Sequence, residues 1–149
     1  MNVNKNATIL ANLTFNLLAR CQEKESRLAE QHNLLEAEFK CLRLMSSEEN
    51  PNNKEIAEKM NLSPSRITRI TDGLIKKGYM LREINPADRR NMVLNLSKRG
   101  KNLTTRLNNA FIKIHQEILN EIDQKQHESL ILAIENLHLA IERWLERPG

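Results

Sequence analysis

The sequence predicts a mainly α-helical fold that carries one small β-hairpin. Apolar residues recur at steps of three and four over most of the 149 residues, which is the spacing of amphipathic helices. Two short β-prone runs, "YMLREI" and "MVLNL", interrupt this pattern between Tyr79 and Leu96. A chain of this length can bury a real hydrophobic core, so we expect a single domain over residues 1–149.

The N-terminal part of the chain predicts two helices. The first runs from Ala7 to about Glu30 without proline or glycine, and its apolar stripe consists of Leu10, Leu13, Leu17, Leu18, Cys21 and Leu28. The second runs from about Leu35 to Met45, and the loop "SSEENPNN" ends it.

The next two predicted helices are short and have clear start and stop signals. The first opens with Asn52 as its N-cap and has Glu55 three residues later, so each side chain can satisfy a backbone N–H at the helix start. After the turn "NLS", Ser63 is a good N-cap and Pro64 takes the first helical position, where its missing N–H costs nothing. This helix ends just before Gly78, which can adopt the left-handed conformation of a helix terminus.

The two β-prone runs are separated by the seven residues Asn85–Asn91, and we interpret them as a hairpin with an unusually long, basic loop. Ser97 can cap a further helix, and the remaining chain is helical in pattern. One apolar stripe consists of Leu103, Leu107, Phe111, Ile114, Ile118 and Ile122. After a polar break near "DQKQHES", a second stripe consists of Leu130, Ile134, Leu137, Ile141 and Leu145.

Positive charge is concentrated in the middle of the chain. Lys54–Lys101 contains twelve Lys and Arg residues against five Asp and Glu, whereas the rest of the chain contains eleven against fourteen. The net charge of +4 therefore hides a basic centre between acidic flanks. Such a distribution indicates that the centre meets a polyanion while the ends have another role.

Two short helices joined by a tight turn and followed at once by a hairpin form the layout of a winged helix-turn-helix. In the second short helix the positions expected to pack inward are Ile67, Ile70 and Leu74. The outward positions carry groups suited to base edges and phosphates, namely Ser65, Arg66, Thr68, Arg69 and Asp72. An intrahelical ion pair such as Arg69 with Asp72 is the plainer alternative for this face.

The hairpin would extend along the duplex if the second helix lay in the major groove. Arg89 and Arg90 could then reach a neighbouring minor groove, where a narrow A·T-rich geometry concentrates negative potential. Asp88 can orient one of these arginines through an ion pair. Cations expected near phosphates are Lys76, Lys77, Lys98, Arg99 and Lys101. A solvated basic turn is the plainer alternative, but the preceding helix-turn-helix favours DNA contact.

The segment "LSPSRITRITDGLIKKGYMLREINPADRRNMVLNLSKRG", residues 62–100, resembles the MarR family of bacterial transcription regulators. It looks like the family's recognition helix, its Asp-x-Arg wing and its Leu-Thr-x-x-Gly helix start. The resemblance implies a homodimer with intertwined N- and C-terminal helices and a wing arginine, here Arg90, in the minor groove. It also implies DNA contacts from Ser65, Arg66, Thr68 and Arg69, to which we add Ser63 at the helix start. The chain departs from the family pattern at Ser97, where threonine is usual, and at mid-helix Gly73, where a larger residue is common. A mid-helix glycine should cost about 1 kcal/mol relative to alanine, so either something packs closely there or the helix is locally soft.

The resemblance divides the single MarR-type domain into a winged helix-turn-helix lobe, residues 33–100, and a helical dimerisation region, residues 1–32 and 101–149. The terminal helices carry more apolar surface than a thin lobe can cover, which favours a partner. Dimerisation is predicted through Leu10, Leu13, Leu17, Leu137, Ile141 and Leu145. A twofold dimer would place two recognition helices roughly 34 Å apart on a pseudo-palindromic operator.

The sequence thus predicts a cytoplasmic DNA-binding regulator of transcription, most simply a ligand-responsive repressor, without a membrane segment, catalytic motif, cofactor or metal site. The resemblance implies a small-molecule effector bound between the dimer helices and the lobe. One alternative is a metal- or redox-sensing regulator of the same fold, although Cys21 and Cys41 show no recognised spacing and are expected to be reduced core residues. Another is a winged-helix module for protein contacts that does not bind DNA.

Overall fold

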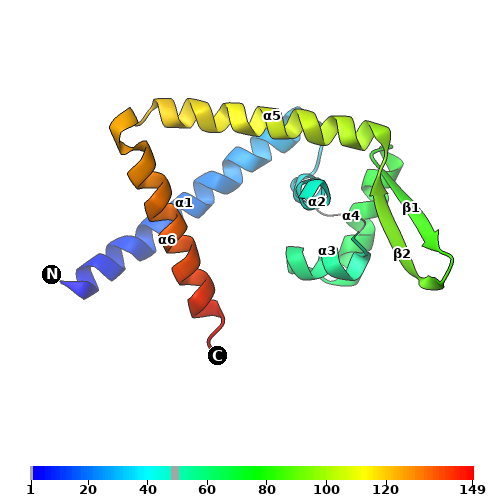
Figure 1. The fold of residues 1–149 in the computed structure, drawn as a ribbon, viewed down its shortest axis with the longest axis horizontal. Coiled ribbons are helices and arrows are strands. Elements are labelled where there is room, and N and C mark those ends of the chain that lie inside the picture. The colour runs from blue at the N-terminus through cyan, green and yellow to red at the C-terminus, as the bar shows by residue number, and fades with distance from the viewer. Residues whose placement is uncertain (1, 48–50) are drawn as a thin grey trace. The chain divides into compact units, whose positions relative to one another are not determined.

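The computed structural model describes residues 2–47 and 51–149, without the side chains of residues 46, 47, 85 and 88–92 (Figure 1). The chain divides into two compact units, Met1–Asn108 and Asn109–Gly149. In chain order the elements are α1 (Val3–Gln31), α2 (Glu36–Ser47), α3 (Asn53–Met60), α4 (Pro64–Lys76), β1 (Met80–Asn85), β2 (Asp88–Leu96), α5 (Lys98–Asn120), the 3₁₀ helix η1 (Gln124–Gln126) and α6 (His127–Leu145). The predicted mainly helical fold with one antiparallel hairpin is confirmed.

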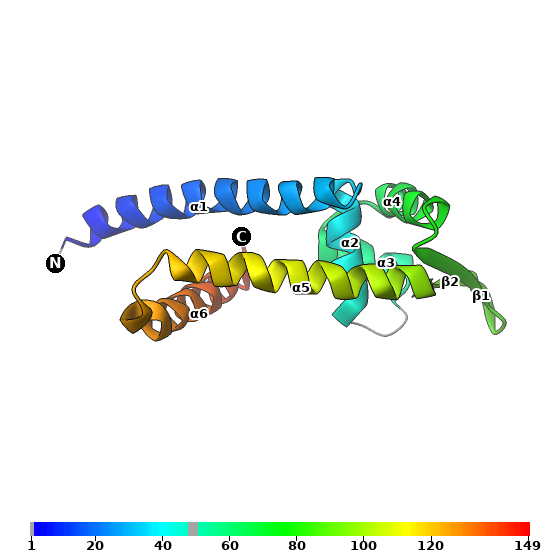
Figure 2. The same ribbon diagram turned by 90° about the horizontal axis from the view of Figure 1, so that it is seen from above.

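Helix α1 is longer than predicted and buries little of its surface. It begins at Val3 because Asn2 acts as its N-cap and accepts a hydrogen bond from the Lys5 N–H at 3.2 Å. Figure 2 shows α1 as one continuous helix. Its only fully buried side chains are Leu28 and Ala29, near its C-terminal end.

The core of the first unit lies where α2, α3, α4 and the hairpin meet. Helix α4 packs against α2, α3 and β1, and Asn52 forms an isolated antiparallel bridge with Val93 of β2. The hairpin is therefore attached to the helix-turn-helix through both α3 and α4. Fully buried apolar side chains at this centre are Phe39, Leu42, Ile56, Ile67, Leu74, Met80, Leu94, Leu103 and Leu107.

The predicted helix ends around the helix-turn-helix are confirmed. Asn52 accepts a hydrogen bond from the Glu55 N–H at 2.9 Å, and Ser63 accepts one from the Arg66 N–H at 3.3 Å. Gly78 has a φ of 83° and donates its N–H to the Ile75 carbonyl at 2.9 Å. The following N–H, from Tyr79, reaches the Leu74 carbonyl, which completes a Schellman motif at the end of α4.

The start of α5 is locked to the end of α4. The Ser97 hydroxyl caps α5 by accepting from the Gly100 N–H at 3.0 Å and donates to the Gly78 carbonyl at 2.6 Å. A Cβ at position 100 would collide with the carbonyl oxygen of Tyr79, so this position requires glycine. Serine therefore performs the capping role expected of the usual threonine.

The prediction of a long loop between the two β-prone runs is wrong. Strand β2 already begins at Asp88, so the turn consists of Pro86 and Ala87 alone. Asn85 pairs with Asp88 and Ile84 pairs with Met92, which leaves residues 89–91 without partners on β1. The hairpin therefore contains a register shift where a loop was predicted.

The second unit contains the end of α5, η1 and α6. The predicted polar break is present, and Nε2 of His127 lies 2.8 Å from the Leu119 carbonyl oxygen and 2.9 Å from that of Ile122. Two carbonyl acceptors require a proton on Nε2, so the imidazole holds the end of α5 by donating to them. Helix α6 buries no residue although apolar side chains recur along it. Among the described residues, no helix has both the length and the apolar character needed to cross a membrane.

Candidate nucleic-acid interface

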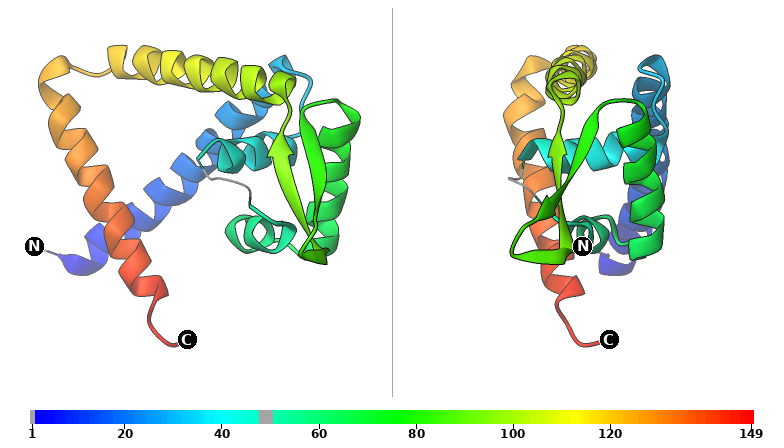
Figure 3. Two further views of the ribbon diagram at one scale, coloured as in Figure 1. Left: turned by 45° about the vertical axis from the view of Figure 1, so that its right-hand side comes forward. Right: turned by 90° about the vertical axis from the view of Figure 1, so that its right-hand side faces the viewer.

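Helix α4 has one buried and one exposed face, as predicted. Ile67 and Leu74 are fully buried, together with Thr71, whose hydroxyl donates to the Ile67 carbonyl at 3.0 Å. Ile70 is half-buried. The exposed residues of the helix include Ser65, Arg66, Arg69 and Asp72. Figure 3 shows α4 beside the hairpin, and α4 packs against β1.

The first two turns of α4 and its N-cap combine exposed hydroxyls with two exposed guanidinium groups. The hydroxyls of Ser63 and Ser65 lie 3.2 Å apart, within hydrogen-bond reach. Arg66 and Arg69 make no ion pair with any described residue, so both guanidinium groups can bind an external acceptor. Thr68 was predicted to face outward but is half-buried. Its hydroxyl donates to the Pro64 carbonyl at 3.0 Å.

An ion pair joins the exposed face of α4 to the hairpin. Asp72 accepts a hydrogen bond from the guanidinium of Arg82 on β1 at 2.5 Å. The pairing with Arg69 considered from the sequence is thus replaced by a partner from another element. The contact therefore joins β1 to α4 through partly exposed side chains.

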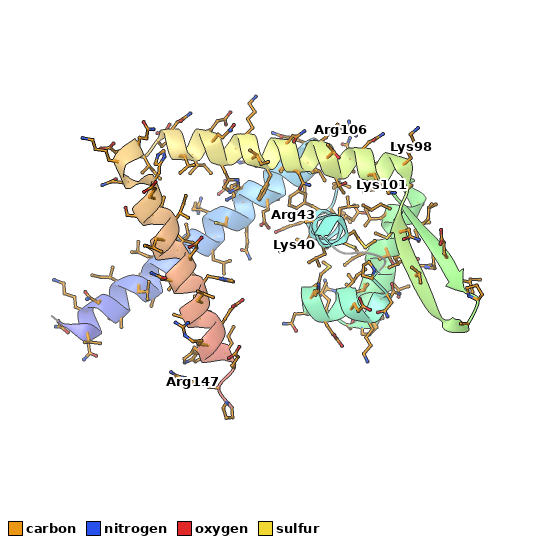
Figure 4. The ribbon with its side chains drawn as sticks, viewed as in Figure 1. Lys40, Arg43, Lys98, Lys101, Arg106 and Arg147 are labelled. Atoms are coloured by element: carbon orange, nitrogen blue, oxygen red, sulfur yellow. The ribbon has the colours of Figure 1, made fainter. Side chains whose placement is uncertain are left out.

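The predicted phosphate-contacting cations fall into two groups. Lys76, Lys98 and Lys101 are exposed, and Figure 4 shows the last two at the start of α5. By contrast, the Lys77 ammonium donates to the Glu38 carboxylate at 2.6 Å and to the Asn33 carbonyl at 3.1 Å. Arg99 lies over the Tyr79 ring, 5.2 Å from its centroid, and donates to the Lys77 carbonyl at 3.4 Å.

The wing residues Asp88, Arg89 and Arg90 are placed by their backbone alone. All three belong to β2, and the two arginines lie in the stretch without partners on β1. Their side chains lie outside the described part of the chain, so their predicted contacts with DNA stay predictions.

A cleft of about 870 Å³ lies within the first unit, and the sequence did not indicate which residues line it. Its lining comes from α1 to α5, and Figure 4 shows two of its cations, Lys40 and Arg43, on α2. The charged lining consists of Lys40, Arg43, Lys59 and Arg66 against Glu25 and Glu36. The cleft therefore has an excess of positive charge, and Arg66 belongs both to it and to the exposed face of α4.

The two cysteines have different environments. Cys41 is fully buried on α2, and burial together with the nearby charge of Glu38 raises the pKa of its thiol from 9.0 to about 12. Cys21 on α1 is half-buried, with the Lys24 ammonium 4.0 Å from its sulfur. In the described part of the chain, no group of three or more His, Cys, Asp or Glu side chains is placed to hold a metal ion.

A helix-turn-helix with a hairpin attached to its second helix defines a winged helix-turn-helix protein. Residues 34–92 match the family model described as MarR family, so this part of the chain is similar to that family of transcriptional regulators. The chain is 26% identical over 116 residues to the HTH-type transcriptional regulator SarZ of Staphylococcus epidermidis, covering 76% of each chain.

Two solved structures illustrate the likeness in fold. A MarR family protein from Bacillus stearothermophilus superimposes with a TM-score of 0.85 at 15% identity, over 95% of this chain and 99% of that one. A mutant of S. aureus MepR, bound to an oligodeoxyribonucleotide, superimposes with a TM-score of 0.64 at 13% identity, over 88% of this chain and 97% of that one.

Proposed function

We propose that the protein is a homodimeric transcriptional repressor that binds a pseudo-palindromic operator with α4 in the major groove. The observation that carries this proposal is the exposed face of α4, where Arg66 and Arg69 have no ion-pair partner among the described residues. Guanidinium groups in this position suit guanine edges and phosphates. The MepR mutant with bound oligodeoxyribonucleotide supports the proposal, because it has the same fold.

The other residues that we propose to contact DNA do so near the start of α4, in the minor groove or at phosphates. Ser63, Ser65 and Thr68 contact the DNA near the start of α4, while Arg89 and Arg90 enter the minor groove with Asp88 orienting one of them. Lys76 and Lys98 contact phosphates. We do not extend this role to Lys77, because its ammonium is held by Glu38.

The dimer forms through the uncovered apolar faces of the terminal helices. Leu10, Leu13 and Leu17 on α1 are 46, 60 and 50% exposed, and on α6 Ile141 and Leu145 are 45 and 66% exposed. Leu137 is half-buried. Apolar faces of this extent are typical of interfaces, and a second copy of the chain presents matching faces by twofold symmetry.

The effector is an anionic small molecule that binds in the cleft. Four of the six charged side chains that line the cleft are cationic, which favours a carboxylate or phosphate-bearing ligand. Because Arg66 lines the cleft and also belongs to the DNA-reading face, such a ligand competes with DNA for one guanidinium group. Repression is then relieved to the extent that the ligand prefers the DNA-free state.

Binding to duplex fragments selected from genomic DNA tests the proposal. We expect the affinity to fall steeply with salt, and Arg69→Ala and Arg90→Ala to weaken binding by about 1–3 kcal/mol each if they read bases. The matched control is Lys125→Ala in η1, which removes a charge outside the lobe and should leave the affinity unchanged. A folded dimer that ignores every duplex at low ionic strength would contradict the proposal.

A further inference from the structure

A buried carboxylate connects α2 with the C-terminal end of α4. Glu38, in the first turn of α2, is only 2% exposed. Its Oε1 accepts a hydrogen bond from the Leu35 N–H at 2.8 Å, which is the return half of a capping box, and one from the Lys77 ammonium at 2.6 Å. One oxygen atom therefore caps α2 and binds the residue that follows α4.

The other oxygen of the same carboxylate occupies the space beside Gly73. A Cβ at position 73 would lie 2.8 Å from Oε2 of Glu38, which is closer than Cβ atoms come to non-bonded heavy atoms in proteins. Glycine in the middle of a helix is unfavourable, but here any larger residue would displace Glu38. This close packing explains the mid-helix glycine noted in the sequence.

The contacts of Glu38 with Gly73 and Lys77 lie on one face of α4. Gly73 and Lys77 are four residues apart, which places them one turn apart on the same side. The Lys77 ammonium is further held by the Asn33 carbonyl at 3.1 Å, in the turn before α2. A buried carboxylate is tolerated only with such partners, so moving or rotating α4 would leave this charge unpaired.

We propose that Glu38 is a positioning residue for DNA binding. Through its contacts with Lys77 and Gly73 it fixes the rotation of α4 about its own axis and the position of α4 along that axis relative to α2. The position of α4 in turn sets where Arg66 and Arg69 meet the duplex. This inference rests on the proposed function, and it assigns a role to a residue that touches no DNA.

A double-mutant cycle between positions 38 and 73 tests the inference. We measure operator affinity and thermal stability for Gly73→Ala, Glu38→Ala and the double variant. Gly73→Ala alone should weaken DNA binding at least tenfold, because its methyl group displaces the carboxylate. In the Glu38→Ala background the same substitution should change the affinity less than twofold, because the space is already empty. Equal effects of Gly73→Ala in both backgrounds would overturn the inference.

Two further variants separate positioning from a general loss of stability. Glu38→Gln keeps the volume and the acceptor for the Leu35 N–H, so it should retain more affinity than Glu38→Ala, and Gly73→Ala should remain harmful in its presence. If Glu38→Ala does not fold, Glu38→Asp takes its place in the cycle, because its shorter side chain withdraws the carboxylate from position 73 and Gly73→Ala should then weaken binding less than in the parent. Leu107→Val trims a fully buried residue of α5 and should lower the melting temperature without changing the affinity of the folded protein.

The outcomes distinguish failure of the inference from failure of the proposed function. If Leu107→Val weakened binding as much as Gly73→Ala at equal stability, Glu38 would have only a structural role. If the parent protein bound no duplex, the proposed function would fall, and the inference with it. A parent that binds DNA while the two positions behave independently would overturn the inference alone.

Discussion

Helices α4 and α6 both have an apolar face, but only α4 covers that face within the chain. Ile67 and Leu74 of α4 are fully buried, whereas α6 buries no residue and leaves Trp144 and Leu145 63 and 66% exposed. An apolar stripe is stable in water only when another surface covers it. The difference shows that the lobe completes its own core, while α6 leaves its apolar face uncovered.

Truncation of a buried residue in α4 should have the largest effect on folding. Leu74→Ala should lower the free energy of unfolding by about 2–5 kcal/mol, because it leaves a cavity among side chains that cannot collapse fully. Urea denaturation followed by circular dichroism measures this loss. The loss should not depend on protein concentration, and Ile141→Ala on α6 is the contrasting variant, whose effect should disappear on dilution. If Leu74→Ala and Ile141→Ala lowered the free energy of unfolding equally and independently of protein concentration, the contrast between α4 and α6 would be contradicted.

A charge on the uncovered face of α6 should break the dimer and leave the lobe folded. Ile141→Asp should convert the dimer to monomer at micromolar concentration, because pairing the faces would bury a carboxylate without a partner. Sedimentation velocity measures the change in mass, and the helical content should be retained. Glu135→Ala, an exposed polar position of the same helix, is the control. An unchanged dimer would place the interface elsewhere.

Signals that are local in the sequence predicted local structure well. Asn52, Ser63 and Gly78 were assigned correctly because a helix end is determined by the few residues around it. The predicted hairpin loop was wrong because residues 88–91 are polar, although β2 continues through them to the pair of Asp88 with Asn85. A strand can contain polar residues and a register shift, so composition underestimated its length.

Contacts between distant residues could not be predicted. Glu38 resembles an ordinary exposed helix residue until its partner Lys77, 39 positions later, is brought to it by the fold. For the same reason Lys77 was grouped with Lys76 as a phosphate contact, and the residues that line the cleft around Arg66 were not predicted. The exposed face of α4 was predictable because its pattern lies within one helix.

The two cysteines give a second comparison, between the buried Cys41 on α2 and the half-buried Cys21 on α1. Because the pKa of Cys41 is raised to about 12, its thiolate is scarce at pH 8, and Cys21 should react with a thiol reagent much faster. In the unfolded chain Cys41 regains its ordinary pKa of 9.0. The raised pKa in the fold therefore stabilises nothing extra below pH 9, and the free energy of unfolding should fall as the pH rises from 9 towards 12.

Mass spectrometry after timed labelling measures the two rates, and Cys41→Ser is the control that should leave the Cys21 rate unchanged. Fast labelling of Cys41 in the folded protein would show that the lobe opens readily. It would also restore Cys41 as a candidate for redox sensing.

The ion pair between α4 and the hairpin should contribute least to stability. Asp72 is 55% exposed at its side chain, so solvent screens its attraction for Arg82. Asp72→Asn should therefore lower the free energy of unfolding by less than about 1 kcal/mol, as surface pairs do. If the pair also holds the hairpin at a fixed angle to α4, the same variant should weaken operator binding more than it weakens folding. Glu83→Gln, an exposed carboxylate on the neighbouring residue of β1, supplies the matched control. Equal small effects of both variants on DNA affinity would mean that the hairpin finds its angle from the packing of β1 on α4 alone.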